Sequence, residues 1–181
     1  MAKSLAKLGS TRELRVKAAG RRVRALIVAA ALALSAAPVE AATTTTTFTV
    51  QITITASCII VSASTLNFGS QGVLSANVDQ TSTIQVQCTN TTPYNIGLDA
   101  GTGTGATVAA RKMTNGGATV TYTLYSDSGR TTVWGNTVGT NTVAATGNGA
   151  SQSYTVYGRV APQTTPAPAT YTDTITVTVT Y

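Results

Sequence analysis

The stretch YTDTITVTVTY at residues 171–181 places a threonine at every even position from 172 to 180. The odd positions carry mainly apolar or aromatic side chains, at Tyr171, Ile175, Val177, Val179 and Tyr181. Because successive side chains of a β-strand point to opposite faces, this alternation predicts a strand with one face in a core and one in water. Half-buried strands of this kind are typical of antiparallel sheets.

The same alternation recurs along the chain before this stretch. It appears at residues 47–55, 83–88, 94–99, 119–124 and 153–160. Turn-forming residues separate these segments, among them Asn115-Gly116-Gly117, which is typical of a tight hairpin. The sequence therefore predicts an all-β fold, a sandwich of about six to seven short antiparallel strands.

The N-terminal part of the chain has a different composition. Eight of the twelve lysines and arginines lie within residues 1–24, and the apolar run ALIVAAALALSAA follows at residues 25–37. This run is shorter than the roughly 20 residues that a membrane-spanning helix needs. Residues 1–41 are therefore predicted to be a cleavable signal peptide, cut between Ala41 and Ala42, with an uncleaved membrane anchor as the alternative.

Beyond Glu40 the charges balance, with four cations against four aspartates. The formal net charge of +6 therefore belongs to the N-terminus, and no nucleic-acid partner is expected.

Residues 42–181 contain neither His nor Glu, so a Ser-His-Asp or Cys-His arrangement is excluded. We expect no enzyme activity, no cofactor or metal and no small-molecule substrate. The Arg111-Lys112 pair is interpreted as a solvated turn, and the aspartates as solvated or turn-capping residues.

Cys58 and Cys88 are the two cysteines of the chain. An exported protein meets an oxidising compartment, so a disulfide between them is the first interpretation. A redox pair and a metal site are the alternatives, although the sequence has no CxxC motif and no histidine.

Five aromatic residues suggest either a sandwich core and its rim, which we favour, or a sugar-binding face. These residues are Tyr122, Tyr125, Trp134, Tyr154 and Tyr157.

An additional strand-like segment precedes the sandwich. Residues 43–55 alternate threonine or glutamine with the apolar Phe48, Val50, Ile52 and Ile54, directly before the strand expected at Cys58-Ile59-Ile60-Val61. Two interpretations of this segment are open. Residues 48–61 form one long first strand, or residues 43–55 are a spare strand that is offered to another molecule by β-strand addition.

Several motifs together resemble a known family. They are Ser57-Cys58, Leu66-Asn67-Phe68-Gly69, IQVQC at 84–88, YTLYSD at 122–127 with Arg130, VYGRVAP at 156–162, and the ending from Tyr171 to Tyr181. With these motifs, residues 42–181 resemble the spore coat protein U domain, the fold of archaic chaperone–usher pilus subunits.

This resemblance implies an incomplete immunoglobulin-like sandwich that is completed by donor-strand exchange. Residues 42–56 would be the N-terminal extension with the donor strand Phe48, Val50, Ile52 and Ile54, and residues 57–181 the pilin domain. Ile59 and Val61 would flank one side of the acceptor groove, and Ile175, Val177 and Val179 the other. The Tyr181 carboxylate would anchor a chaperone, and a Cys58–Cys88 bridge would join the first two strands.

The resemblance also implies partners and a location. A periplasmic chaperone would lend a strand, and at an outer-membrane usher a neighbouring pilin subunit would replace it. The product would be a fimbria on the cell surface that serves adhesion or biofilm formation, with this chain as a shaft or minor subunit. Two alternatives stay open: a spore-coat or surface-matrix protein that forms no fibre, and a secreted carbohydrate-binding β-sandwich.

Overall fold

The computed structural model describes residues 39–181, so the predicted signal peptide lies outside the described residues except for its last three positions. The chain divides into two units, one ending at Thr49 and the other covering Val50–Tyr181. In the first unit, residues 39–49 are exposed and form no strand. Every strand described below belongs to the second unit.

The second unit is built from strands, as the alternation predicts. Eight strands follow one another along the chain: β1 (Cys58–Ala63), β2 (Val78–Cys88), β3 (Pro93–Leu98), β4 (Arg111–Asn115), β5 (Ala118–Tyr125), β6 (Val143–Thr146), β7 (Ser151–Val160) and β8 (Val177–Thr180). Residues 39–181 include no helix that is long and apolar enough to cross a membrane.

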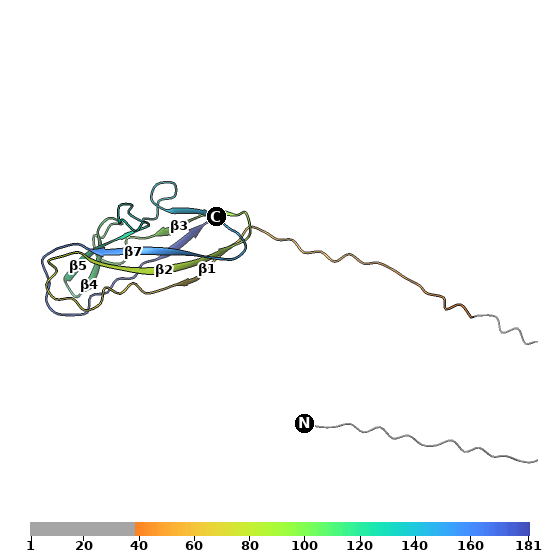
Figure 1. Ribbon diagram of the computed structural model, residues 1–181, viewed down its shortest axis with the longest axis horizontal. Helices are drawn as coiled ribbons and strands as arrows, with labels where there is room; N and C mark the ends of the chain where they lie inside the picture. Colours follow the sequence, from red (N-terminus) through yellow and green to blue (C-terminus); the bar gives the residue numbers. More distant parts are fainter. Residues whose placement is uncertain (1–38) are drawn as a thin grey trace, which may run out of the picture. The chain divides into compact units, whose positions relative to one another are not determined.

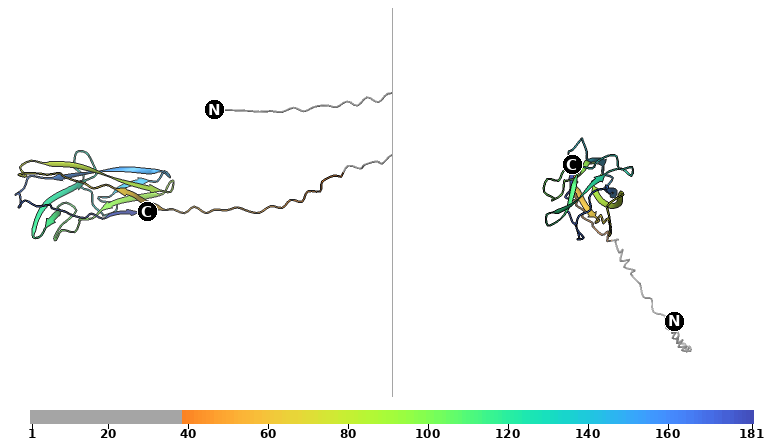
Figure 2. Two further views of the ribbon diagram at one scale, coloured as in Figure 1. Left: turned by 90° about the horizontal axis from the view of Figure 1, so that it is seen from below. Right: turned by 90° about the vertical axis from the view of Figure 1, so that its left-hand side faces the viewer.

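The strands form two antiparallel sheets that pack face to face (Figures 1 and 2). The larger sheet has the order β1-β2-β7-β5-β4, and the smaller sheet has the order β6-β3-β8. The predicted hairpin joins β4 to β5, where Asn115 pairs with Ala118 and Gly116 has a φ of 56°. The predicted all-β sandwich is therefore confirmed, with eight strands where about six to seven were expected.

The core lies between the inner faces of the two sheets. The larger sheet contributes alternate residues such as Ile84 and Val86, and the smaller sheet contributes Ile96 and Leu98, all nearly inaccessible to solvent. Trp134 enters the core from a loop and donates its indole N–H to the carbonyl of Ile96 at 2.8 Å. The partner matters because a buried indole N–H without an acceptor would destabilise the fold.

The stretch at 171–181 forms a shorter strand than its alternation predicts, because β8 begins only at Val177. The residues before it are held by other contacts. Thr172 exchanges hydrogen bonds with the backbone of Thr114, and the Asp173 carboxylate accepts from the amides of Thr102 and Thr174. Over residues 172–174, the Asp173 carboxylate and the single bridge between Thr114 and Thr172 take the place of a continuous β-ladder.

Gly158 on β7 makes room for the chain that follows β1. A Cβ at this position would lie 2.7 Å from Leu66 Cδ1 and 3.0 Å from Phe68 Cζ. The missing side chain therefore lets the Leu66-Asn67-Phe68-Gly69 motif pack against the inner face of the larger sheet, where Leu66 and Phe68 contact the core.

Gly158→Ala is expected to destabilise the sandwich by about 1–3 kcal/mol, because the added methyl overpacks this contact. The free energy of unfolding in urea measures the effect. Gly117→Ala is the control, since a Cβ there meets nothing within 4 Å. If Gly158→Ala costs as much in a Leu66→Ala background as in the parent chain, the contact with Leu66 is not the cause.

Candidate functional site

Two neighbouring strand edges of the sandwich carry no partner strand within residues 39–181. β1 pairs with β2 alone at one margin of the larger sheet, and β8 pairs with β3 alone at one margin of the smaller sheet. β1 and β8 approach each other at the opening between the sheets, although no ladder joins them. Unpaired N–H and C=O groups on such edges are templates for another strand.

The apolar side chains at these edges are incompletely covered. On β1, Ile59 is 57% exposed, Ile60 42% and Val61 46%. On the other side, Ile175, Val177 and Val179 are half-buried and pack against the core. The opening between β1 and β8 therefore gives access to apolar surface that a complete sandwich would bury.

The register of β1 shows which of its side chains face the core. Cys58 pairs with Cys88 and Ile60 pairs with Val86, and both partners are buried. Ile60 therefore shares the inner face with Cys58, whereas Ile59 lies opposite Gln87 on the outer face. Val61 falls in an irregularity of the pairing between Ile60 and Ser62.

The sequence prediction of Ile59 and Val61 as groove residues thus missed Ile60. Counting in steps of two from Cys58 would have found it, because a cysteine that bonds to a buried partner must itself face inward. The predicted groove residues Ile175, Val177 and Val179 do share the inner face, since Val177 pairs with Leu98 and Val179 with Ile96.

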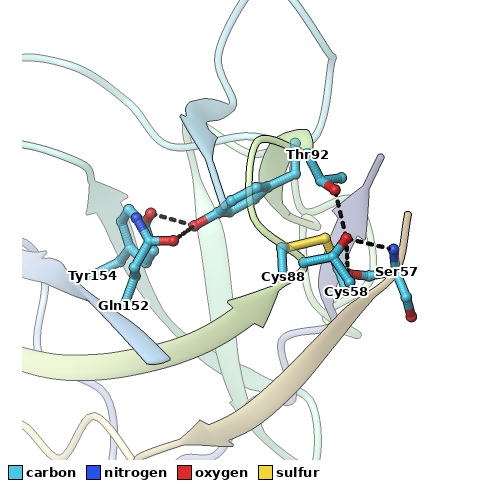
Figure 3. The surroundings of a disulfide bond; sticks show 8 residues. Ser57, Cys58, Cys88, Thr92, Gln152 and Tyr154 are labelled. Atoms are coloured by element: carbon cyan, nitrogen blue, oxygen red, sulfur yellow. Dashed lines mark hydrogen bonds between the residues drawn. A yellow bond between two sulfur atoms is a disulfide. The ribbon is translucent and has the colours of Figure 1, made fainter. Parts of the chain in front are cut away.

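The disulfide between Cys58 and Cys88 is present, which confirms the first interpretation of the cysteines. It joins the first residue of β1 to the last residue of β2 (Figure 3). Next to it, Ser57 and Thr89 exchange hydrogen bonds through the Ser57 amide and the Thr89 amide, at 3.1 and 2.9 Å. In the chain-entropy model a bridge across this separation of 30 residues stabilises the fold by about 3.7 kcal/mol.

A small polar cluster lies near the disulfide, inside the sandwich. The hydroxyl of Tyr94 contacts the hydroxyl of Tyr154 and donates to Gln152 Oε1 at 3.1 Å (Figure 3). Burial raises the pKa of Tyr94, and the hydrogen bond to Tyr154 raises it further. Tyr94 therefore stays neutral at physiological pH and serves packing.

Trp134 and Tyr122 are also buried, as expected of core aromatics, while Tyr125, Tyr154 and Tyr157 are half-buried.

The segment before β1 is extended and uncovered. Phe48, Val50, Ile52 and Ile54 are between 72% and 86% exposed, and no strand is assigned to residues 39–57. The interpretation of residues 48–61 as one long strand is therefore wrong, because β1 begins at Cys58. Ala41 and Ala42 are exposed, and Tyr181 is 61% exposed.

The expectation that Arg111 lies in a solvated turn is wrong. Arg111 is on β4, and its side chain is completely buried. Its guanidinium donates to four backbone carbonyls, those of Leu98, Asp99, Val108 and Trp134. Burial lowers the pKa of Arg111, and the nearby Tyr122, Asp99 and Asp173 oppose that effect. Arg111 thus joins the end of β3 and the β3–β4 connection to the β5–β6 connection, a role that its neighbours in the sequence do not reveal.

Asp99 and Asp127 cap turns, as expected of the aspartates, whereas Asp79 lies on β2 and is engaged in ion pairs. Asp127 accepts from the amides of Thr131 and Thr132 in its own turn, and Asp99 accepts from the amides of Gly101 and Thr176. Asp79 forms ion pairs with Arg130 and Arg159. Within the described residues, no three His, Cys, Asp or Glu side chains gather to hold a metal ion.

Within the described part of the chain, the sandwich has two unpaired strand edges that border uncovered apolar side chains, and a disulfide at the start of its first strand. These features place the domain in the class of incomplete β-sandwiches. The family model of the Spore Coat Protein U domain matches residues 44–178, and this chain belongs to that family. It is 34% identical to "Protein U" of Myxococcus xanthus over an alignment of 129 positions, which covers 65% of this chain and 72% of that protein.

Among solved structures, the chain is similar to one from the archaic chaperone–usher Csu pili of Acinetobacter baumannii. That structure is a pre-assembly complex of the chaperone CsuC with the tip adhesion subunit CsuE. The TM-score is 0.50 at 25% identity, over 71% of this chain. The match spans 40% of the length of the solved chain.

Proposed function

We propose that this chain is an exported subunit of a chaperone–usher pilus that polymerises by donor-strand exchange. The observation that carries the proposal is the pair of adjacent open edges on β1 and β8, which border uncovered apolar surface. A strand inserted there would pair with both edges and complete the sandwich. Membership of the family and the likeness to a chaperone–subunit complex support this function.

Residues 43–55 are proposed to be the inserted strand of the next subunit. Phe48, Val50, Ile52 and Ile54 follow one another at the period of two that places all four on one face of a strand. Burying each of them would contribute roughly 1.5–3 kcal/mol before the ordering costs of association. Ile60, Val61, Val177 and Val179 are proposed to line the receiving groove, with Ile175 at its end.

The proposal includes a route and a purpose. The precursor carries residues 1–41 as a signal peptide and is exported to the periplasm. A chaperone occupies the groove there, with Tyr181 as its anchor, until the outer-membrane usher exchanges it for the segment of a neighbouring subunit. The fibre is displayed on the cell surface, where it serves adhesion and biofilm formation. No catalytic step is part of this function.

A second candidate is a surface-coat subunit that is deposited without forming a fibre. The description of the family and the 34% identity to Protein U favour it. Electron microscopy of cells that express the chain separates the two candidates, because filaments support the pilus and an amorphous layer supports the coat.

Deletion of residues 43–55 tests the donor segment. We expect the deletion to abolish fibres in electron micrographs while the chain still copurifies with its chaperone, because the receiving groove is intact. Deletion of residues 43–47 alone is the matched control and should leave fibres, since it removes threonines and none of the apolar side chains. Normal fibres after the longer deletion would contradict the donor assignment.

A further inference from the structure

The outer face of the larger sheet collects the accessible positive charge of residues 39–181. These residues include four cations, of which Arg111 is buried. The other three stand on the outer side of the sheet. Lys112 pairs with Thr121 on that face, Arg159 alternates with the buried Val160, and Arg130 reaches Asp79 there. A cationic face on an otherwise neutral domain points to an anionic partner.

One anion on this face offsets part of the positive charge of its three cations. Asp79 lies on the same face and is shared by two guanidinium groups, from Arg159 at 2.7 Å and from Arg130 at 3.3 Å. A hydrogen bond from Arg159 lowers the pKa of Asp79, so its carboxylate is charged at neutral pH. Asp127 accepts from the amides of Thr131 and Thr132 in its own turn and keeps its negative charge there.

Arg159 keeps hydrogen-bonding capacity for a further partner. It uses Nε and one terminal nitrogen for Asp79, and its other terminal nitrogen makes no hydrogen bond within the described residues. Its side chain is 27% exposed, twice the exposure of Arg130, whose guanidinium covers the ring of Tyr157 at 5.7 Å. Arg159 is therefore the more available guanidinium of the two.

A surface hollow lies beside Arg159. Its lining includes an aromatic ring, hydroxyl groups and an amide, from Tyr125, Thr121, Thr123 and Gln163, together with Pro162. Tyr125 lies directly opposite Tyr157 across β5 and β7. The side chain of Gln163 is fixed by two hydrogen bonds to the backbone of Thr121, which keeps this wall in place.

We propose that this hollow binds an acidic polysaccharide, with a sugar carboxylate on Arg159 and a sugar ring against Tyr125. Guanidinium groups pair with carboxylates through charge-assisted hydrogen bonds, and aromatic rings pack against the apolar faces of sugars. The threonine hydroxyls are suited to the hydroxyl groups of the same chain. None of these residues belongs to the β1 and β8 edges, so this binding is independent of the proposed polymerisation.

The test measures binding of the exported chain, residues 42–181, to immobilised polygalacturonate, with neutral dextran as the reference, because the eight cations of residues 1–24 would bind a polyanion by themselves. We expect binding to polygalacturonate alone, weakened by sodium chloride because salt screens exposed charges. Arg159→Gln should weaken it about tenfold, since one charge-assisted contact is lost. Tyr125→Ala should also weaken it while leaving the ion pair intact. Lys112→Gln is the matched control, because it also removes one positive charge but from a side chain that donates to the Thr104 carbonyl and does not line the hollow. It should change binding less than about twofold.

Asp79→Asn distinguishes binding from a structural role of the ion pairs. It frees both guanidinium groups, so we expect tighter binding, opposite in sign to Arg159→Gln. The proposal is overturned if Asp79→Asn and Arg159→Gln both weaken binding equally, or if dextran binds as well as polygalacturonate. Self-association that is lost in Arg159→Gln and unaffected by polygalacturonate would overturn it in favour of a contact between copies of the chain.

Discussion

Ile52→Asp is expected to abolish fibre assembly, whereas the neighbouring Gln51→Asp is expected to leave it largely intact. Side chains alternate between the two faces of a strand, so Ile52 would point into the receiving groove and Gln51 out of it. A carboxylate in the groove would lose its hydration without a cationic partner, which costs several kcal/mol. Both substitutions introduce one negative charge, at adjacent residues. They therefore differ mainly in the face of the inserted strand that carries the charge.

Electron microscopy and the size distribution of the exported protein measure the effect. Phe48→Asp should behave like Ile52→Asp, because the two residues share a face. Copurification with the chaperone is the control for folding, since the groove is unchanged in all three variants. Equal effects at Gln51, Ile52 and Phe48 would contradict insertion as a strand.

Arg111→Met is expected to destabilise the sandwich by roughly 4 kcal/mol or more. The change leaves four carbonyls without their common donor, and each buried acceptor that loses its partner costs about 1–3 kcal/mol. Lys112→Met is the matched control, because it removes a neighbouring cation that is only half-buried. It should cost less than about 1 kcal/mol.

Urea unfolding that is followed by tryptophan fluorescence measures this effect directly. Trp134 is the one tryptophan of the chain, and its carbonyl accepts from Arg111 at 2.7 Å. The signal therefore reports on the region that the substitution disturbs. An unchanged unfolding midpoint in Arg111→Met would show that the carbonyls find other donors.

The sequence predicts the parts of this molecule that depend on local periodicity. Alternation places Ile84 and Val86 on one face of β2 and Ile96 and Leu98 on one face of β3, and these are the core residues observed. The disulfide follows from the cysteine count and the exported location. These features depend on side-chain period and on chemistry that a single segment carries.

The features that the sequence does not predict depend on partners far along the chain. Arg111 looks like a surface cation because its four acceptors lie at positions 98, 99, 108 and 134. Val177, and not Tyr171, begins β8 because Asp173 and Thr172 are engaged elsewhere. Ile60 was missed because β1 has no visible alternation of polar and apolar residues. Its face follows from its distance of two residues from Cys58, and its pairing with the buried Val86 agrees.

The position of the disulfide has a mechanical consequence. A tensile load on residues 50–57 reaches the sandwich at Cys58, the first residue of β1. Held by hydrogen bonds alone, an edge strand that is pulled from its end would peel away one bond at a time. The covalent link to Cys88 sits at that end and transfers the load to β2, which lies between β1 and β7 in the sheet. The domain can thus bear force through its N-terminal segment without losing the strand that borders the opening.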